Sequence, residues 1–109
     1  MITLKVMVDY QCSPLWMISP DSVDNPDPYD VVSAPLADRL TAWAEELDAT
    51  FDAEVGQNSG FKTEAERAAH DSRGLELARL VAAEVGDRYK VTFQGWGIPL
   101  EVMADPEQA

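Results

Sequence analysis

Four aspartates recur at every third position of the segment PDSVDNPDPYD, which spans residues 20–30: Asp21, Asp24, Asp27 and Asp30. Closely spaced carboxylates could bind Ca²⁺, a hard cation that takes several oxygen ligands. The segment lacks both the glycine turn and the closing glutamate of an EF-hand loop. We therefore predict no metal site here. Two interpretations stay open: a solvated loop, and a surface that contacts a basic partner.

The other reactive residue types do not form a recognisable catalytic set. His70 is the only histidine, and a helical projection places it on the same face as Val81, which favours a structural role. Cys12 is the only cysteine and belongs to no CxxC motif. Glu45 and Glu46 are adjacent, so on a helix they would point about 100° apart and could not act as a carboxylate pair. Phosphate-loop, GxSxG, HExxH and zinc motifs are also missing from the sequence. We predict a protein that is not an enzyme, with no catalytic residue and no cofactor.

The negative charge is concentrated in one part of the chain. The sequence contains 20 acidic and 8 basic residues, and its net charge is −12. Residues 6–61 contain eleven acidic residues and a single basic one, Arg39, whereas acidic and basic residues balance over 62–100. Binding to nucleic acid would need clustered lysine and arginine to neutralise phosphates, so this class is disfavoured, as is an anionic membrane surface. A concentrated anionic surface could instead steer a basic protein partner.

Hydrophobic periodicity predicts two helices between strands. Alternating apolar residues predict a strand over 2–9, and LWMI at 15–18 is a candidate second strand. Four prolines in 19–35 predict a long acidic loop without regular structure. A helix is predicted over 35–54, with Ser33 as its cap. A second helix is predicted over 63–85, with a capping box formed by Thr63 and Glu66 and with Gly86 ending it in the left-handed conformation. Segments 89–94 and 98–103 alternate again and predict a hairpin around Gly95-Trp96-Gly97.

This order of elements predicts a two-layer α+β fold, with both helices on one face of a sheet of three or four strands. We expect a single domain over 1–104 and a frayed tail over 105–109. The sequence shows neither an export signal nor a membrane segment, which predicts a cytoplasmic location. In the first helix the predicted apolar stripe contains Leu36, Leu40, Trp43, Leu47 and Phe51.

Four pieces of the sequence together resemble a known group of proteins. They are Pro14-Leu15-Trp16 with the aspartate after the first strand, AWAEELDATFD in the first helix, SGFKTEAER before the second helix, and RGLELARLVAAEVGDRYKV. As a set they resemble a family of small acidic bacterial proteins that is frequent in actinomycete-type genomes and includes suspected immunity-type proteins for secreted toxins. The resemblance covers most of residues 4–93. It implies the strand–helix–helix–strand order and implies no catalytic residues.

The leading hypothesis is a non-enzymatic protein that neutralises a basic toxin or nuclease by covering its anion-binding surface. The predicted contact residues are carboxylates of the loop and the first helix, with one aromatic anchor: Asp21, Asp24, Asp27, Asp30, Asp38, Glu45, Asp48, Asp52 and Trp16. Three alternatives stay open: a phage-type inhibitor that mimics nucleic acid, a small-ligand protein that uses Cys12 or His70 in a pocket under the loop, and a structural or oligomerisation module.

Overall fold

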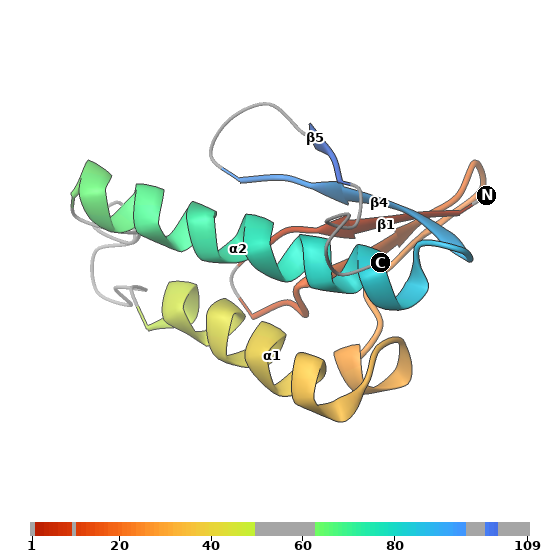
Figure 1. Ribbon diagram of the computed structural model, residues 1–109, viewed down its shortest axis with the longest axis horizontal. Coiled ribbons are helices and arrows are strands. Elements are labelled where there is room, and N and C mark those ends of the chain that lie inside the picture. The colour runs from red at the N-terminus through yellow and green to blue at the C-terminus, as the bar shows by residue number, and fades with distance from the viewer. Residues whose placement is uncertain (1, 10, 50–62, 96–99, 103–109) are drawn as a thin grey trace.

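The computed structural model describes residues 2–9, 11–49, 63–95 and 100–102. In chain order the elements are β1 (Ile2–Val6), β2 (Leu15–Ile18), β3 (Val23–Asp24), the 3₁₀ helix η1 (Pro28–Asp30), α1 (Ala34–Asp48), α2 (Glu64–Val85), β4 (Tyr89–Phe93) and β5 (Leu100–Glu101). The predicted α+β class is confirmed. Both helices lie on one side of the sheet, and they run in opposite directions along it (Figure 1).

The sheet has the strand order β3-β2-β1-β4-β5. β1 pairs antiparallel with β2 and parallel with β4, so the chain leaves one edge of β1, passes through both helices and returns to its other edge. β4 and β5 form an antiparallel pair, as predicted for the closing hairpin. The edge strands β3 and β5 have two residues each, and with them the sheet contains five strands.

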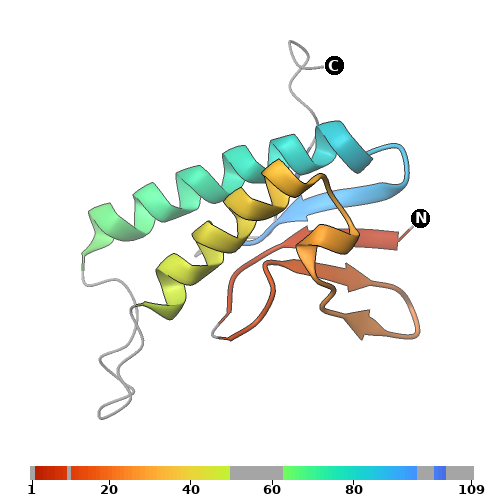
Figure 2. The same ribbon diagram turned by 90° about the horizontal axis from the view of Figure 1, so that it is seen from below.

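Alternation along the strands gives the sheet two different faces. Leu4 and Val6 of β1 and Leu15 of β2 are fully buried toward the helices. Register pairs Lys5 with Trp16 and Thr3 with Ile18, so these residues share the opposite face. Figure 2 shows both helices in front of the first face, and in the parts of the chain that the structure describes no helix lies on the second face. We call it the open face.

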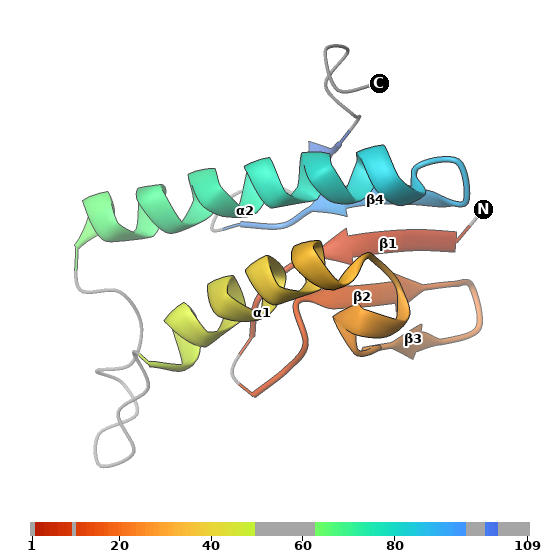
Figure 3. The ribbon, with the colours of Figure 1, turned by 60° about the horizontal axis from the view of Figure 1, so that its bottom comes forward.

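The core lies between the sheet and the two helices. The predicted stripe of α1 is buried as far as it is described, and α2 adds its own apolar face. α2 packs on β4, whereas α1 packs on α2 and η1 (Figure 3). The central buried side chains are Leu4, Val6, Leu15, Leu40, Trp43, Leu77, Val81, Val85, Val91 and Phe93.

Several predicted boundaries and caps need correction. The segment 19–35 contains β3 and η1, so the prediction of no regular structure is wrong there. Gly86 ends α2 as predicted, but in the right-handed conformation with φ −64°, because its N–H still bonds to the carbonyl of Ala82. The first strand ends at Val6, and α1 ends at Asp48. Residues 50–54, Trp96 and the tail lie outside the described residues.

The two helix starts behave differently from each other. Thr63 caps α2 as predicted, because its hydroxyl accepts the N–H of Glu66. Ser33 occupies the cap position of α1 but makes no side-chain cap bond. Its N–H and hydroxyl instead donate to the two carboxylate oxygens of Glu84 on α2, at 2.8 and 2.6 Å. The start of α1 is therefore tied to α2.

Candidate functional site: an acidic pocket beside Tyr29

Asn25 fixes the acidic segment to the β1–β2 connection. Its amide nitrogen donates to the carbonyls of Ser13 and Leu15, and its oxygen accepts the N–H of Ser13 at 2.9 Å. The hydroxyl of Ser13 donates in turn to the carbonyl of Pro26 at 2.6 Å. These bonds satisfy backbone groups of Ser13, Leu15 and Pro26. The acidic segment is thus held in one path between β2 and α1.

η1 presents Tyr29 at the surface. The carboxylate of Asp27 accepts the N–H of Tyr29 at 3.0 Å and so caps this short helix, while Pro28 is buried beneath it. The ring of Tyr29 is 50% exposed. Its hydroxyl donates to the carboxylate of Asp38 on α1. Hydrogen bonds therefore hold both the backbone N–H and the hydroxyl of Tyr29, while much of the residue remains accessible.

An open pocket of about 550 Å³ lies beside Tyr29, between η1, α1 and the β1–β2 connection. We call it the Tyr29 pocket. The three carboxylates of its described lining come from two separate segments: Asp27 from the loop, and Glu45 and Asp48 from α1. The complete lining is Gln11, Cys12, Ser13, Pro14, Asn25, Asp27, Pro28, Tyr29, Thr41, Ala44, Glu45 and Asp48.

The charges around the pocket act on Tyr29 itself. The hydrogen bond to Asp38 raises the pKa of the Tyr29 phenol, and desolvation and the nearby charges of Asp38, Asp27 and Glu45 raise this pKa further. The phenol therefore stays protonated at physiological pH and can donate its hydrogen bond to Asp38. A neutral aromatic ring next to several carboxylates is an environment that suits a guanidinium or ammonium group.

Asp48 has a second role at the pocket rim. Its carboxylate accepts the N–H of Gln11 at 2.8 Å. Gln11 has φ 60°, a left-handed conformation that is uncommon for residues other than glycine. The bond thus joins the end of α1 to a turn between β1 and β2 and shapes that side of the pocket.

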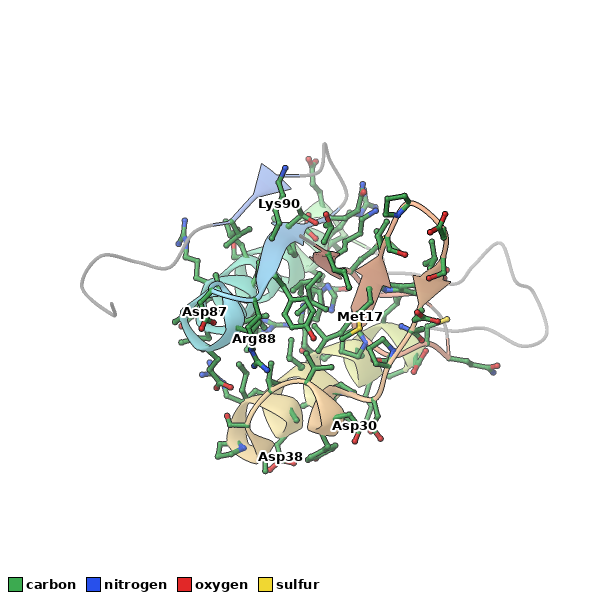
Figure 4. All side chains as sticks on the ribbon, turned by 90° about the vertical axis from the view of Figure 1, so that its right-hand side faces the viewer. Met17, Asp30, Asp38, Asp87, Arg88 and Lys90 are labelled. Atoms are coloured by element: carbon green, nitrogen blue, oxygen red, sulfur yellow. The ribbon has the colours of Figure 1, made fainter. Side chains whose placement is uncertain are left out.

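The other predicted carboxylates that the structure describes do not line this pocket, although Asp38 accepts the hydrogen bond of Tyr29 at its edge. Asp21 and Asp24 are exposed on the β2–β3 hairpin, and neither lines the pocket. Asp30 and Asp38 lie on the side of the molecule formed by η1 and α1, away from Lys90 (Figure 4). Asp52 lies outside the described residues.

Trp16 does not join the acidic surface. It pairs with Lys5 on the open face, and its indole N–H donates to the carbonyl of Met7 at 3.0 Å. The neighbouring Leu15 points the other way and is fully buried. Trp16 and the Tyr29 pocket consequently belong to different surfaces of the molecule.

Cys12 and His70, the residues of the small-ligand alternative, are not brought together. Cys12 lines the Tyr29 pocket, whereas His70 is 0% exposed between α1 and α2. The structural role predicted for His70 agrees with this placement. Glu45 and Glu46 also diverge as expected: Glu45 lines the Tyr29 pocket, and Glu46 pairs with Arg73 of α2.

The part of the chain that the structure describes lacks two features, a metal-binding cluster and a membrane-spanning helix. No group of three or more His, Cys, Asp or Glu side chains is arranged there to hold a metal ion. Neither α1 nor α2 combines the length and the apolar character that a membrane-spanning helix requires.

Sequence reasoning missed Tyr29 and Asn25. Tyr29 is the only aromatic residue within the aspartate-spaced segment, and an aromatic residue in an acidic loop is a recognisable interface signal. Asn25 precedes a proline, a dipeptide typical of turns, but its partners at positions 13 and 15 depend on the tertiary fold.

The comparison with protein families gives a match to a family described as Serratia CdiI immunity protein-like, and the match covers residues 2–95. No curated protein matches the chain. The matched range contains β1 to β4, both helices and every lining residue of the Tyr29 pocket. The immunity-type part of the resemblance seen in the sequence is confirmed, and its actinomycete part stays a prediction. From this match, the chain belongs to the Serratia CdiI immunity protein-like family.

Proposed function

We propose that this protein is a non-enzymatic immunity protein that neutralises a basic toxin by covering the toxin's anion-binding surface. Membership of an immunity protein-like family supports the general role. The observation that carries the finer proposal is the convergence of Asp27, Glu45 and Asp48 around the exposed ring of Tyr29. Toxins that act on nucleic acids or other anions present cationic sites, and such sites complement this pocket in charge.

The mechanism is occlusion. An arginine or lysine of the toxin would enter the Tyr29 pocket, stack on the half-exposed ring and pair with carboxylates from two segments. Side chains that the toxin uses to bind its substrate would then be occupied by this protein. Because Asp27, Asp48 and Tyr29 are already fixed by hydrogen bonds, little side-chain entropy is lost on binding.

The proposal also explains why one half of the chain is so acidic. Carboxylates around the pocket would accelerate encounter with a basic toxin by long-range attraction. The exposed acids of the β2–β3 hairpin would add to this field without entering the pocket. Affinity for the toxin should therefore decrease as the salt concentration rises.

The test begins with affinity capture from the native cell lysate, using the tagged protein as bait and a rising salt gradient for elution, with mass spectrometry as the readout. We expect one basic protein to elute at intermediate salt. Expressing that protein should arrest growth, and co-expression of this chain should restore it. A captured protein that is acidic, or whose expression is harmless, would contradict the proposal.

A matched pair of charge variants tests which surface binds the toxin. The pocket variant carries Asp27→Asn, Glu45→Gln and Asp48→Asn, which remove three charges and keep acceptors for the bonds to Tyr29 and Gln11. The control variant removes three charges from exposed positions on α2 and its end, with Glu64→Gln, Glu76→Gln and Asp87→Asn. We expect the pocket variant to lose protection against the toxin and the control variant to retain it. Equal loss in both would show that only net charge matters.

A further inference from the structure

Arg39 is an exception to the charge around it. It is the only basic residue within residues 6–61, a range that contains eleven acidic residues. It lies on α1 directly after Asp38, and its side chain is exposed. Its positive charge weakens the attraction that the acidic surface exerts on a basic partner. Long-range attraction to the toxin therefore does not account for an arginine at this position.

Arg39 has no partner within the part of the chain that the structure describes. The positions three and four residues away along α1 hold proline, leucine, alanine and tryptophan, so no neighbour on the helix offers a carboxylate. Glu46, two turns further along α1, pairs with Arg73. Glu84 of α2 accepts both donors of Ser33. No described hydrogen bond or ion pair holds the guanidinium of Arg39, which is left for a group of another molecule.

Arg39 and the Tyr29 pocket lie on two sides of the same helix. α2 runs along one side of α1, and η1 lies beside the start of α1 (Figure 3). Two hollows, of about 450 and 270 Å³, lie between α1 and α2, and Arg39 lines both. Asp38, the residue before Arg39, accepts the hydrogen bond of the Tyr29 hydroxyl on the other side. Only the width of α1, about 10–12 Å with its side chains, separates the two places.

This short separation affects any protein that binds the Tyr29 pocket. A standard protein–protein interface covers about 800 Å² of each partner, which corresponds to a patch roughly 30 Å wide. Centred on the Tyr29 pocket, such a patch reaches across α1 to Arg39. Water is then removed from a guanidinium that carries five donors, and this costs free energy unless the toxin supplies acceptors. A toxin with an interface of ordinary size must therefore bring a group that Arg39 can bind.

We propose that Arg39 selects the cognate toxin by binding a carboxylate of that toxin. The inference rests on the proposed function, and it adds a second contact, of opposite charge, to the toxin's cation in the Tyr29 pocket. A carboxylate has two acceptor oxygens that match the guanidinium fork, whereas a lysine or arginine at this place would be repelled. A surface of carboxylates alone attracts many basic proteins. Arg39 penalises those that lack a carboxylate at the right distance from their own cation.

The larger of the two hollows suits the approach of this carboxylate. Its acidic lining residue, Glu84, directs both carboxylate oxygens to Ser33. Leucine side chains of both helices line the same hollow, and they reduce the water that competes for a hydrogen bond to Arg39. The smaller hollow contains two acidic residues, so a carboxylate is less favourable there.

Surface plasmon resonance of the captured toxin on the full chain and its variants measures the role of Arg39. Arg39→Gln makes the chain one unit more negative, so it would bind a basic toxin more tightly if Arg39 only weakened attraction. We expect instead at least tenfold weaker binding, mainly through faster dissociation. The control Arg79→Gln makes the same change of charge at an exposed position of α2 that lines neither the Tyr29 pocket nor the two hollows. This control should bind the toxin at least as tightly as wild type. Polylysine, a basic probe without acidic side chains, should bind Arg39→Gln at least as tightly as wild type.

Charge reversal tests which group Arg39 binds. Arg39→Glu should bind the wild-type toxin more weakly still, and replacement of one aspartate or glutamate of the toxin by lysine should restore binding to Arg39→Glu. Wild-type affinity of Arg39→Gln would overturn the selection by Arg39 and leave the proposed function in place. So would a failure of every such toxin variant to restore Arg39→Glu while circular dichroism shows that Arg39→Glu is folded. A captured protein that is acidic or harmless would contradict the proposed function, and the role of Arg39 would then be wrong as well.

Discussion

Trp43 and His70 exchange hydrogen bonds across the α1–α2 interface. The indole N–H of Trp43 donates to the carbonyl of His70 at 2.9 Å, and the imidazole Nε2 of His70 lies 3.0 Å from the carbonyl of Trp43. Because a carbonyl only accepts, Nε2 carries the proton in this bond. The rings stack with centroids 4.9 Å apart and planes 15° apart. One pair of residues thus fixes the separation and rotation of the two helices.

Replacement of His70 should destabilise the fold without a direct effect on the pocket. His70→Ala removes a fully buried ring and one hydrogen bond, so we expect a loss of about 2–5 kcal/mol in the free energy of unfolding. His70→Phe keeps a stacked ring beside Trp43 and should lose less. Urea unfolding followed by tryptophan fluorescence measures both. Equal stability of His70→Ala and wild type would remove the structural role assigned to this pair.

The start of α1 offers a test of Ser33 and Glu84. In an isolated helix, aspartate caps as well as serine. Here Ser33 donates to Glu84, so Ser33→Asp would lose the hydroxyl donor and place two carboxylates together. We expect Ser33→Asp to lower the free energy of unfolding by about 1–2 kcal/mol. The double variant with Glu84→Gln should recover part of this loss, and chemical denaturation of the four proteins gives the coupling. If Ser33→Asp were as stable as wild type, the stabilising role assigned to the bonds between Ser33 and Glu84 would be wrong.

The contacts of Trp43 with His70 and of Ser33 with Glu84 show what local sequence patterns cannot predict. Period-two alternation around Leu4 and Val91 and the 3.6-residue period of α1 are local, so the elements and the α+β class could be predicted. The parallel pairing of β1 with β4 and the bond from Ser33 to Glu84 join residues far apart in sequence. Whether the hydroxyl of Ser33 caps its own helix or reaches another depends on the packed structure, which no local pattern specifies.

In the candidate site, too, some features could be predicted from the sequence and others depend on the packed structure. The charge asymmetry and the carboxylates of α1 are visible in the sequence, and Asp27, Glu45 and Asp48 do line one pocket. That Trp16 lies on another surface follows from strand register, because a shift of one residue in β2 would exchange Trp16 with Leu15. Asn25 makes three bonds to Ser13 and Leu15, which lie twelve and ten residues earlier in the chain, and no local pattern predicts these partners.

Asn25 should therefore control the order of this segment. Asn25→Ala leaves the carbonyl of Leu15 without its donor and frees the segment from Ser13, so we expect faster amide exchange over residues 19–33. The exchange in α2 should change little, and this helix provides an internal control. Hydrogen–deuterium exchange with mass spectrometry measures both regions. Unchanged exchange over 19–33 would mean that other contacts hold the acidic segment.

Tyr29 predicts a stability change at alkaline pH. The hydrogen bond to Asp38 and the surrounding negative charges raise its pKa above the ordinary value of 10.0 in the folded state. The folded chain therefore holds the phenol proton of Tyr29 more tightly than the unfolded chain does. The resulting contribution to the free energy of unfolding is complete below the unfolded pKa and is lost as the pH rises through the folded pKa. Comparing wild type with Tyr29→Phe by denaturation on both sides of pH 10 measures this contribution. We expect a steeper alkaline loss in wild type, and identical slopes would contradict the assigned environment.

The kinetics of toxin binding should separate the pocket from the hairpin. Charges at an interface rim mainly change the association rate, whereas charges that become desolvated also change the dissociation rate. Asp21→Asn with Asp24→Asn, on the exposed hairpin, should slow association with the captured toxin several-fold and leave dissociation nearly unchanged. Glu45→Gln with Asp48→Asn, in the Tyr29 pocket, should slow association and also accelerate dissociation. Surface plasmon resonance at two salt concentrations measures both rates. If the hairpin variant accelerated dissociation more than the pocket variant, the buried centre of the interface would lie at the hairpin, and the Tyr29 pocket would be its rim.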